Sequence, residues 1–165
     1  MNKPSKNEVI VNVAVFLWIF VVNVVAAIVS PIPTWPMFFV TIFYFTLGAD
    51  PKNIAKIFLS GAMGLVFALL FALALQYLAP VIGIVPVLCI ALFVILGLVI
   101  VGGGYLPIIF NNITFAYMTI GTINMEIIGD MFLNWMIMLI LGGAIILGGA
   151  LVVLNIVMKQ LAKKG

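Results

Sequence analysis

Residues 40–48 read VTIFYFTLG and residues 113–121 read ITFAYMTIG, so two short stretches of this chain nearly repeat each other. The positions that agree are Thr41, Tyr44, Thr46 and Gly48 in the first copy and Thr114, Tyr117, Thr119 and Gly121 in the second. Each copy follows a proline, Pro36 in one case and Pro107 in the other. Short, proline-interrupted apolar segments at corresponding positions of two halves are typical of the substrate site of a membrane transporter.

The composition places the chain in lipid. Hydrophobic residues make up 67% of the 165 residues, charged residues make up 7%, and the mean hydropathy is +1.44. A soluble domain carries roughly 25% charged residues, so this chain has too few to form a water-facing surface. Its length suffices for about six crossings of about 20 residues each. We therefore predict an all-α integral membrane protein.

The order of segments repeats in residues 1–79 and residues 80–165, which we expect to form one structural domain. Each half is predicted to hold a long helix, a break, a short helix, a polar turn and a second long helix. The predicted helices cover residues 9–29, 36–48 and 54–78 in the first half, and residues 86–102, 107–121 and 131–158 in the second. Prolines interrupt the first half at residues 30–36, where Thr34 is the predicted N-cap and Pro36 suits the first turn. Residues 102–107, which read GGGYLP, are the predicted break in the second half.

The lysines indicate the topology. They supply all seven positive charges of a chain whose net charge is +3. If both short helices cross the membrane, every lysine falls on one side; if the short helices are re-entrant, Lys52 and Lys56 move to the other side. The positive-inside rule favours the first arrangement, with six spans and both termini cytoplasmic in a bacterial inner membrane. Because three spans per repeat is an odd number, the two repeats are predicted to be inverted. The same rule explains the basic excess, so we expect no nucleic-acid partner.

The two short helices carry the candidate site. Each directs the positive end of its dipole, with its first N–H groups, into the membrane. The predicted substrate-binding residues are Thr41, Tyr44, Thr46, Asn111, Asn112, Thr114, Tyr117 and Thr119, and the predicted pathway-lining aromatics are Trp35, Phe39, Phe110 and Phe115. Packing is the alternative for any single threonine or phenylalanine, because membrane helices often bond a hydroxyl to their own turn. For Asn111 and Asn112 a binding role and a structural role stay equally open.

Other chemistry lacks the necessary residues. The chain has no histidine, and its four carboxylates fall at predicted membrane interfaces. No metal-ligand cluster, phosphate-binding loop or nucleophile with a base can be assembled, so we expect no enzyme, cofactor or metal site. Small residues recur every four positions at Ser60, Gly64, Ala68 and Ala72, and again at Ala144 and Gly148. Such stripes let helices approach closely, either between the repeats or between protomers. We expect the protein to form a homo-oligomer.

The pattern resembles a family of bacterial inner-membrane proteins, domain of unknown function 1097. The resemblance rests on Trp35, Phe38-Phe39, Gly48, Lys52 and Gly64 in the first half and on Leu106-Pro107, Phe110 and Thr114-Phe115-Ala116 in the second. It implies a short, almost wholly embedded chain and no particular activity. A looser likeness to urea and small-amide channels implies broken helices that meet at the membrane middle beside hydroxyl and phenylalanine side chains.

We therefore expect a channel or facilitator for a small polar solute, either an amide such as urea or a small anion. Two alternatives stay open. An ion-coupled secondary transporter would need an ion site, which unwound carbonyls at residues 102–104 could supply. A non-transporting accessory subunit would need a fixed membrane partner.

Overall fold

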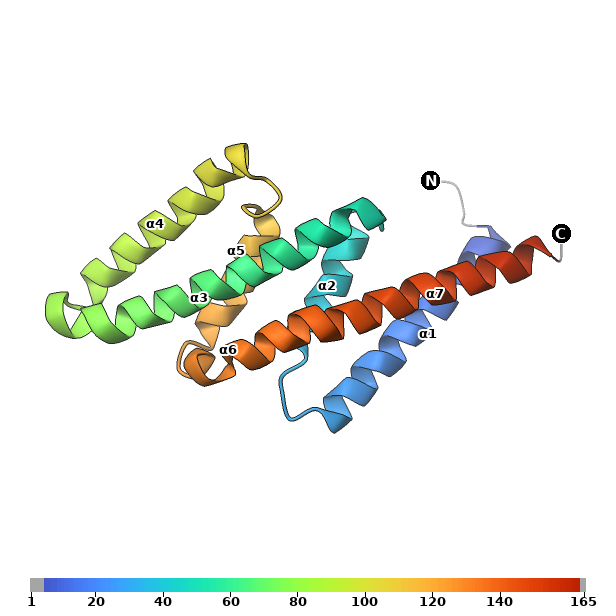
Figure 1. The fold of residues 1–165 in the computed structure, drawn as a ribbon, viewed down its shortest axis with the longest axis horizontal. Helices are drawn as coiled ribbons and strands as arrows, with labels where there is room; N and C mark the ends of the chain where they lie inside the picture. Colours follow the sequence, from blue (N-terminus) through green and yellow to red (C-terminus); the bar gives the residue numbers. More distant parts are fainter. Residues whose placement is uncertain (1–4, 164–165) are drawn as a thin grey trace.

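The computed structural model describes residues 5–163, and within that range all regular structure is helical, without strands. The helices are α1 (Lys6–Val29), α2 (Trp35–Thr46), α3 (Ile54–Ile82), α4 (Ile84–Tyr105), α5 (Asn112–Ile123), α6 (Ile128–Ile137) and α7 (Gly143–Ala162) (Figure 1). A 3₁₀ turn, η1 (Pro51–Asn53), precedes α3, and a π-helical segment, η2 (Met138–Gly142), joins α6 to α7. The predicted order of long and short helices is confirmed.

Four helical runs are long and apolar enough to cross a bilayer by length and composition. They are Lys6–Val29, Pro51–Ile82, Ile84–Tyr105 and Ile128–Ala162. Large apolar side chains stand exposed along α1 and α4, among them Phe16, Phe93 and Ile100. Water would penalise this surface by roughly 25 cal/mol per Å² of apolar area, whereas lipid does not. The protein is therefore membrane-embedded.

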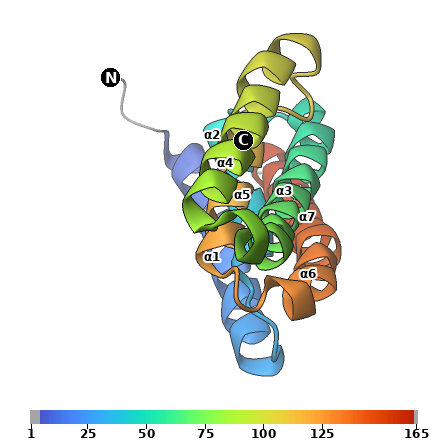
Figure 2. The same cartoon turned by 90° about the vertical axis from the view of Figure 1, so that its left-hand side faces the viewer.

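Equivalent helices of the two halves run in opposite directions. In Figure 1, α1 points in the opposite direction to α4, α2 to α5, and α3 to the α6–α7 run. Each half packs its first two helices on the last helix of the other half: α1 and α2 contact α7, while α4 and α5 contact α3. The α3 helix and the α6–α7 run lie side by side, and the short helices pack against them (Figure 2).

Glycines allow these helices to approach closely. A Cβ atom at Gly64 of α3 would lie 2.5 Å from the Thr114 carbonyl oxygen and 2.6 Å from the Tyr117 Cβ of α5. A Cβ atom at Gly143 of α7 would lie 2.8 Å from a methyl of Val40 in α2. The predicted stripe Ser60, Gly64 and Ala68 is buried, so it joins α3 to a helix of its own chain.

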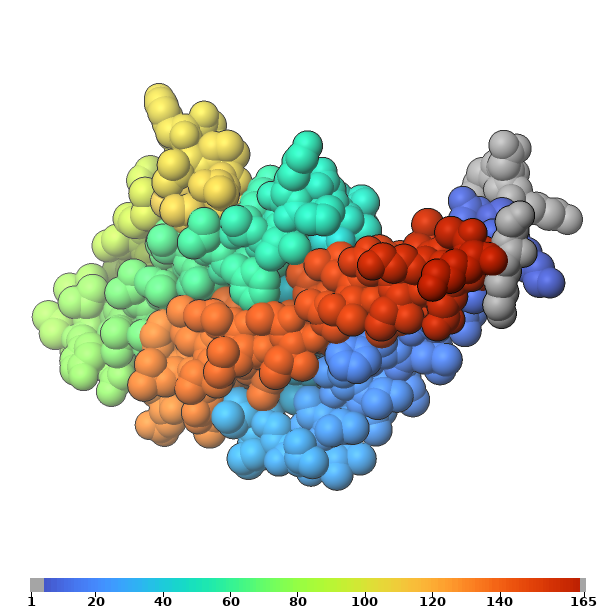
Figure 3. All heavy atoms as spheres, turned by 45° about the vertical axis from the view of Figure 1, so that its right-hand side comes forward, coloured from blue at the N-terminus to red at the C-terminus, as the bar shows by residue number. Residues whose placement is uncertain are grey.

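The α1 helix is held on α7 by a tryptophan. A side chain at Gly149 would collide with the Trp18 ring, and Trp18 Nε1 donates a hydrogen bond of 2.9 Å to the Ile146 carbonyl. The two helices are in contact (Figure 3). On the same helix, a Cβ at Gly148 would meet open space. Gly149 therefore serves packing within the chain, and Gly148 does not.

The break predicted at residues 102–107 is present but begins later than predicted, after Tyr105. The α4 helix continues through glycines 102–104 to Tyr105, and Gly102 accepts the N–H of Leu106. The chain then turns back, so that a Cβ at Gly102 would lie 2.7 Å from the Phe110 ring, and one at Gly103 3.0 Å from the Phe110 carbonyl. The glycines do not unwind the helix; they let the returning chain pass close to it.

Several helix ends and caps also differ from prediction. The second short helix begins at Asn112 and not at Pro107, because the Asn111 side chain caps it by accepting the Ile113 N–H at 2.8 Å. Thr34 provides no side-chain cap for α2, although Pro36 does lie in its first turn as predicted. The α3 helix passes through Pro80 and ends at Ile82, before Gly83 with φ of +90°.

Candidate functional site

An aromatic cluster lies where α2, α5 and α6 meet. Trp35, Phe39 and Phe43 recur every four residues along one face of α2 and surround Tyr117 of α5, with ring centroids 5.7, 5.7 and 6.2 Å from the Tyr117 ring. Trp135 of α6 completes the cluster, with its ring centroid 5.4 Å from that of Trp35 in a T-shaped arrangement. Tyr117 and Trp135 are fully buried. Rings at these separations are in contact with one another.

A buried hydrogen bond joins the two short helices inside this cluster. The Tyr117 hydroxyl donates to the carbonyl oxygen of Pro36 at 2.6 Å. Pro36 lies in the first turn of α2, and Tyr117 lies midway along α5. The N-terminal end of α2 is thereby attached to the middle of α5, so the two copies of the sequence repeat meet in space.

The four predicted threonines have three different environments. Thr46 and Thr119 each donate at 2.8 Å to the carbonyl four residues earlier, Ile42 and Phe115, as membrane helices commonly do. Thr114 is fully buried and donates to the carbonyl of Ile109 in the preceding turn. Thr41 is buried on the face of α2 toward α7, and its hydroxyl has no hydrogen-bond partner.

The two asparagines also separate. Asn111 caps α5 through its Oδ1 atom, while its Nδ2 atom donates to Ser60 Oγ at 2.7 Å and to the Pro107 carbonyl at 2.9 Å. The Ser60 hydroxyl in turn donates to the Ile108 carbonyl at 2.9 Å. This network secures the turn before α5 on α3. Asn112, the next residue, is exposed.

The remaining predicted residues lie apart from the cluster. Tyr44 is buried beside Phe45, at the end of α2 that faces α1 and α7. Phe110 stacks on Phe67 of α3 at 6.1 Å, and Phe115 is exposed at 43%. The structure therefore brings together Trp35, Phe39 and Tyr117 and does not gather all the predicted residues around one hollow.

Sequence reasoning missed one functional candidate, Trp135, and did not foresee that a second, Trp35, has an unbonded donor. Among the described residues, the indole nitrogens of Trp35 and Trp135 are buried without a hydrogen-bond partner. Trp35 was predicted only as an aromatic wall, and Trp135 was not singled out in its long apolar segment. The signal available was chemical: a buried tryptophan usually finds a partner for its N–H. Ser60 was considered only for its small size.

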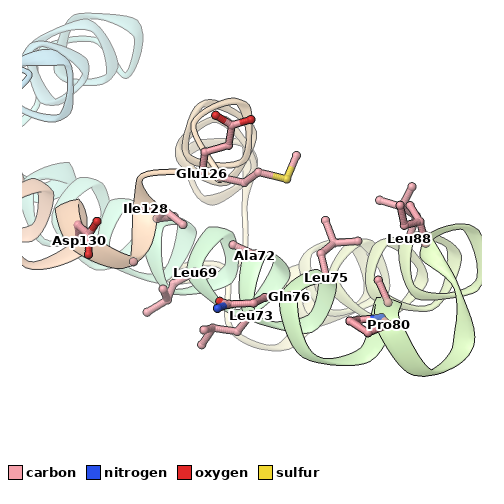
Figure 4. A pocket seen from close by; sticks show the side chains of 14 residues that line it. Leu69, Ala72, Leu73, Leu75, Gln76, Pro80, Leu88, Glu126, Ile128 and Asp130 are labelled. Atoms are coloured by element: carbon pink, nitrogen blue, oxygen red, sulfur yellow. The ribbon is translucent and has the colours of Figure 1, made fainter.

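A hollow of about 920 Å³ lies away from the aromatic cluster, between α3, the start of α4 and the turn from α5 to α6. Leucine side chains form much of its wall, and the polar side chains are Gln76, Glu126 and Asp130 (Figure 4). No group of three possible metal ligands occurs in residues 5–163. The hollow thus offers an amphipathic surface.

These observations define the class: a helical, membrane-embedded protein whose last long helix in each half supports the short helix of the other. Residues 9–161 match the family model described as a protein of unknown function, DUF1097. The chain belongs to this family, as the resemblance predicted. No curated protein and no solved structure matches it.

Proposed function

We propose that this protein lets a small polar solute cross the membrane along a path beside α2. The observation that carries the proposal is the buried hydrogen bond from the Tyr117 hydroxyl to the Pro36 carbonyl. This bond joins two short helices that point in opposite directions. Helices too short to span alone, with irregular backbone next to them, persist in membranes where protein buries them or a watery cavity lies beside them. In transporters such segments form the substrate site.

The proposal includes six membrane spans in two inverted repeats. The α2 helix has 12 residues, or about 18 Å at 1.5 Å per residue, so the extended segment before it would have to complete the crossing. Support comes from the alternating directions of successive helices in Figure 1 and from the exchange of packing partners between the halves. A pseudo-two-fold axis in the membrane plane would produce both features.

We further propose that both termini are cytoplasmic in a bacterial inner membrane. The start of α1, the η1 turn and the end of α7 carry Lys6, Lys52 and Lys159 and lie toward the same end of the molecule in Figure 1, whereas the turn with Glu126 lies at the other. The positive-inside rule then gives the orientation. Lys3 and Lys164, also used in the sequence argument, lie outside the described residues.

Passive movement is favoured over ion coupling. The coupled alternative relied on unwound carbonyls at residues 102–104, and these residues are helical. Thr41 is the predicted residue best suited to a transient contact with solute, because its buried hydroxyl is not committed to any other group. Buried polar groups are almost always bonded, so an unbonded one requires an explanation, and a passing solute provides one.

A homo-oligomer is part of the proposal. Ala144 and Gly148 are exposed on one side of α7, one turn apart, where a close helix contact is possible. A second copy would cover this face, whereas the buried stripe on α3 is already used within the chain.

The test is solute entry into proteoliposomes, followed by stopped-flow light scattering with formamide, acetamide or urea outside. Thr41→Val removes the unbonded hydroxyl and keeps the shape of the side chain. We expect it to lower the protein-dependent rate about three- to tenfold, the value of one hydrogen bond. Thr46→Val is the matched control, because that hydroxyl already bonds its own helix.

Equal rates in liposomes with and without the protein, for all three solutes, would remove the facilitator function and favour an accessory role. Equal loss in Thr41→Val and Thr46→Val would remove Thr41 from the path while leaving the function in place.

A further inference from the structure

Two buried indole N–H groups at the junction of α2 and α6 have no hydrogen-bond partner. Trp135 has no exposed surface, and the Nε1 atoms of both Trp135 and Trp35 are unbonded. Burying an N–H group without a partner costs about 1–3 kcal/mol in proteins. Two unbonded donors in one pair of contacting rings indicate that a ligand accepts their hydrogen bonds.

Contact between the two rings cannot satisfy both donors. The rings meet at 69°, so the edge of one points toward the face of the other. An N–H in that edge can point at the facing ring, which is a weak hydrogen bond. The second indole presents its face, so its own N–H lies in the ring plane and does not point at the first ring. At least one of the two donors therefore remains free in the pair.

The surroundings supply a further backbone donor, and no acceptor is bonded to either indole. Trp35 is the first residue of α2, which has no side-chain cap, so the backbone N–H of Trp35 has no partner within the helix. The carbonyl of Pro36 already receives the Tyr117 hydroxyl. Phe39 and Tyr117 fill the neighbouring positions with aromatic rings. Such a site would match a ligand that accepts hydrogen bonds.

Charge decides which acceptor suits the site better. The described lysines lie near helix ends, at Lys6, Lys52, Lys56, Lys159 and Lys163, and none belongs to the aromatic cluster. An anion buried without a cation loses its hydration and gains no counter-charge. A neutral carbonyl oxygen loses less hydration and has two lone pairs for two donors. A π-helical segment, common at functional sites, begins three residues after Trp135.

We propose that Trp35 and Trp135 form a binding site for the carbonyl oxygen of a small neutral amide. This inference rests on the proposed function, for which it names the class of solute and the step at which the solute is held. The indole N–H groups replace the water that the carbonyl loses, and the aromatic rings contact the rest of the molecule. Trp18 has no part in the site, because its N–H is already bonded to Ile146.

The test is solution NMR of the full-length protein labelled with ¹⁵N in its indole groups. The chain has three tryptophans, so three Nε1–H signals are expected and can be assigned with Trp18→Phe, Trp35→Phe and Trp135→Phe. Formamide is titrated as the probe, and sodium chloride is titrated separately as a small anion. We expect formamide to move the Trp35 and Trp135 signals downfield in a saturable manner and to leave the Trp18 signal unchanged.

The variants sharpen the result. Trp135→Phe is expected to weaken formamide binding about three- to tenfold at Trp35, the value of one hydrogen bond, and Trp18→Phe to leave it unchanged. Absence of a saturable shift at either residue overturns the site, as does equal movement of all three signals. A response to chloride and not to formamide overturns the neutral solute. Facilitated flux without indole shifts removes only this site, whereas saturable shifts without flux remove only the proposed transport.

Discussion

The short helices α2 and α5 carry the same polar residues at the same spacing, yet those residues do different things. Tyr117 of α5 donates to Pro36 inside the aromatic cluster, whereas Tyr44 of α2 lies at the other end of its helix beside Phe45. Thr114 donates to Ile109, whereas Thr41 has no partner. Only Thr46 and Thr119 behave alike.

The difference follows from where each helix begins. The α2 helix begins at Trp35, so Thr41 lies in its middle. The α5 helix begins at Asn112, so Thr114 lies in its first turn, within reach of a carbonyl of the preceding turn. The repeated motif therefore has two environments: the polar groups of α5 are bonded within the fold, whereas α2 keeps a buried hydroxyl and a buried indole N–H without hydrogen-bond partners.

The largest expected effect on stability concerns the glycines against which α5 and α2 pack. Gly64→Ala would press on the backbone of α5, whereas Gly142→Ala would meet side-chain atoms of Met37 and Met138, which can move. Both changes gain about 1 kcal/mol of helix propensity. Because overpacking costs about 1–3 kcal/mol, we expect Gly64→Ala to lower the free energy of unfolding by about 2 kcal/mol more than Gly142→Ala. Unfolding of each variant in detergent by added dodecyl sulfate measures the difference. Equal stabilities would mean that α5 is no more tightly held than α2.

The next effect concerns the start of α5. Asn111→Ala removes the N-cap and leaves Ser60 without the Asn111 donor, so we expect a loss of about 1–2 kcal/mol in the free energy of unfolding. Asn112→Ala is the matched control and should cost less than about 0.5 kcal/mol, because that side chain is exposed. The same dodecyl sulfate titration applies. If Asn112→Ala instead stops solute flux in a stable protein, the binding role predicted for Asn112 stands.

The smallest effect compares the two tyrosines. Tyr117→Phe removes a buried hydrogen bond worth about 1 kcal/mol and should lower the free energy of unfolding by that amount. Tyr44→Phe should change it by less than about 0.5 kcal/mol, since the structure shows no hydrogen bond from that hydroxyl. A cost at Tyr44 as large as that at Tyr117 would contradict the division of roles between the short helices.

Much of the architecture was predictable because it depends on local composition. The apolar runs, the polar turns and the prolines marked the order of long and short helices, and the residues from Trp35 to Phe115 indicated the family. The helix ends were less predictable. Pro107 resembled a helix start, but the Asn111 side chain provides the cap four residues later. Glycines 102–104 resembled part of a break, but Phe110 packs against Gly102 and Gly103 and the helix continues to Tyr105.

The residues of the candidate site were predictable only in part, because their hydrogen-bond partners come from distant parts of the chain. A tryptophan or threonine in an apolar run gives no local sign of whether its polar atom will find a partner. Trp18 and Trp135 both lie in long apolar helices, and only the neighbouring carbonyl of Ile146 distinguishes the first from the second. That carbonyl belongs to a helix more than a hundred residues away in the chain.

The amino-acid sequence alone determined that this protein lies in lipid and is helical, and it determined the internal repeat and the family. Hydropathy and proline placement act over a few residues, so they can be read from the sequence. Tertiary structure alone decided which copy of the repeat became scaffold and which kept free donors. Hydrogen-bond partners and close backbone contacts come from helices distant in the chain, and two stretches with the same polar residues met different neighbours.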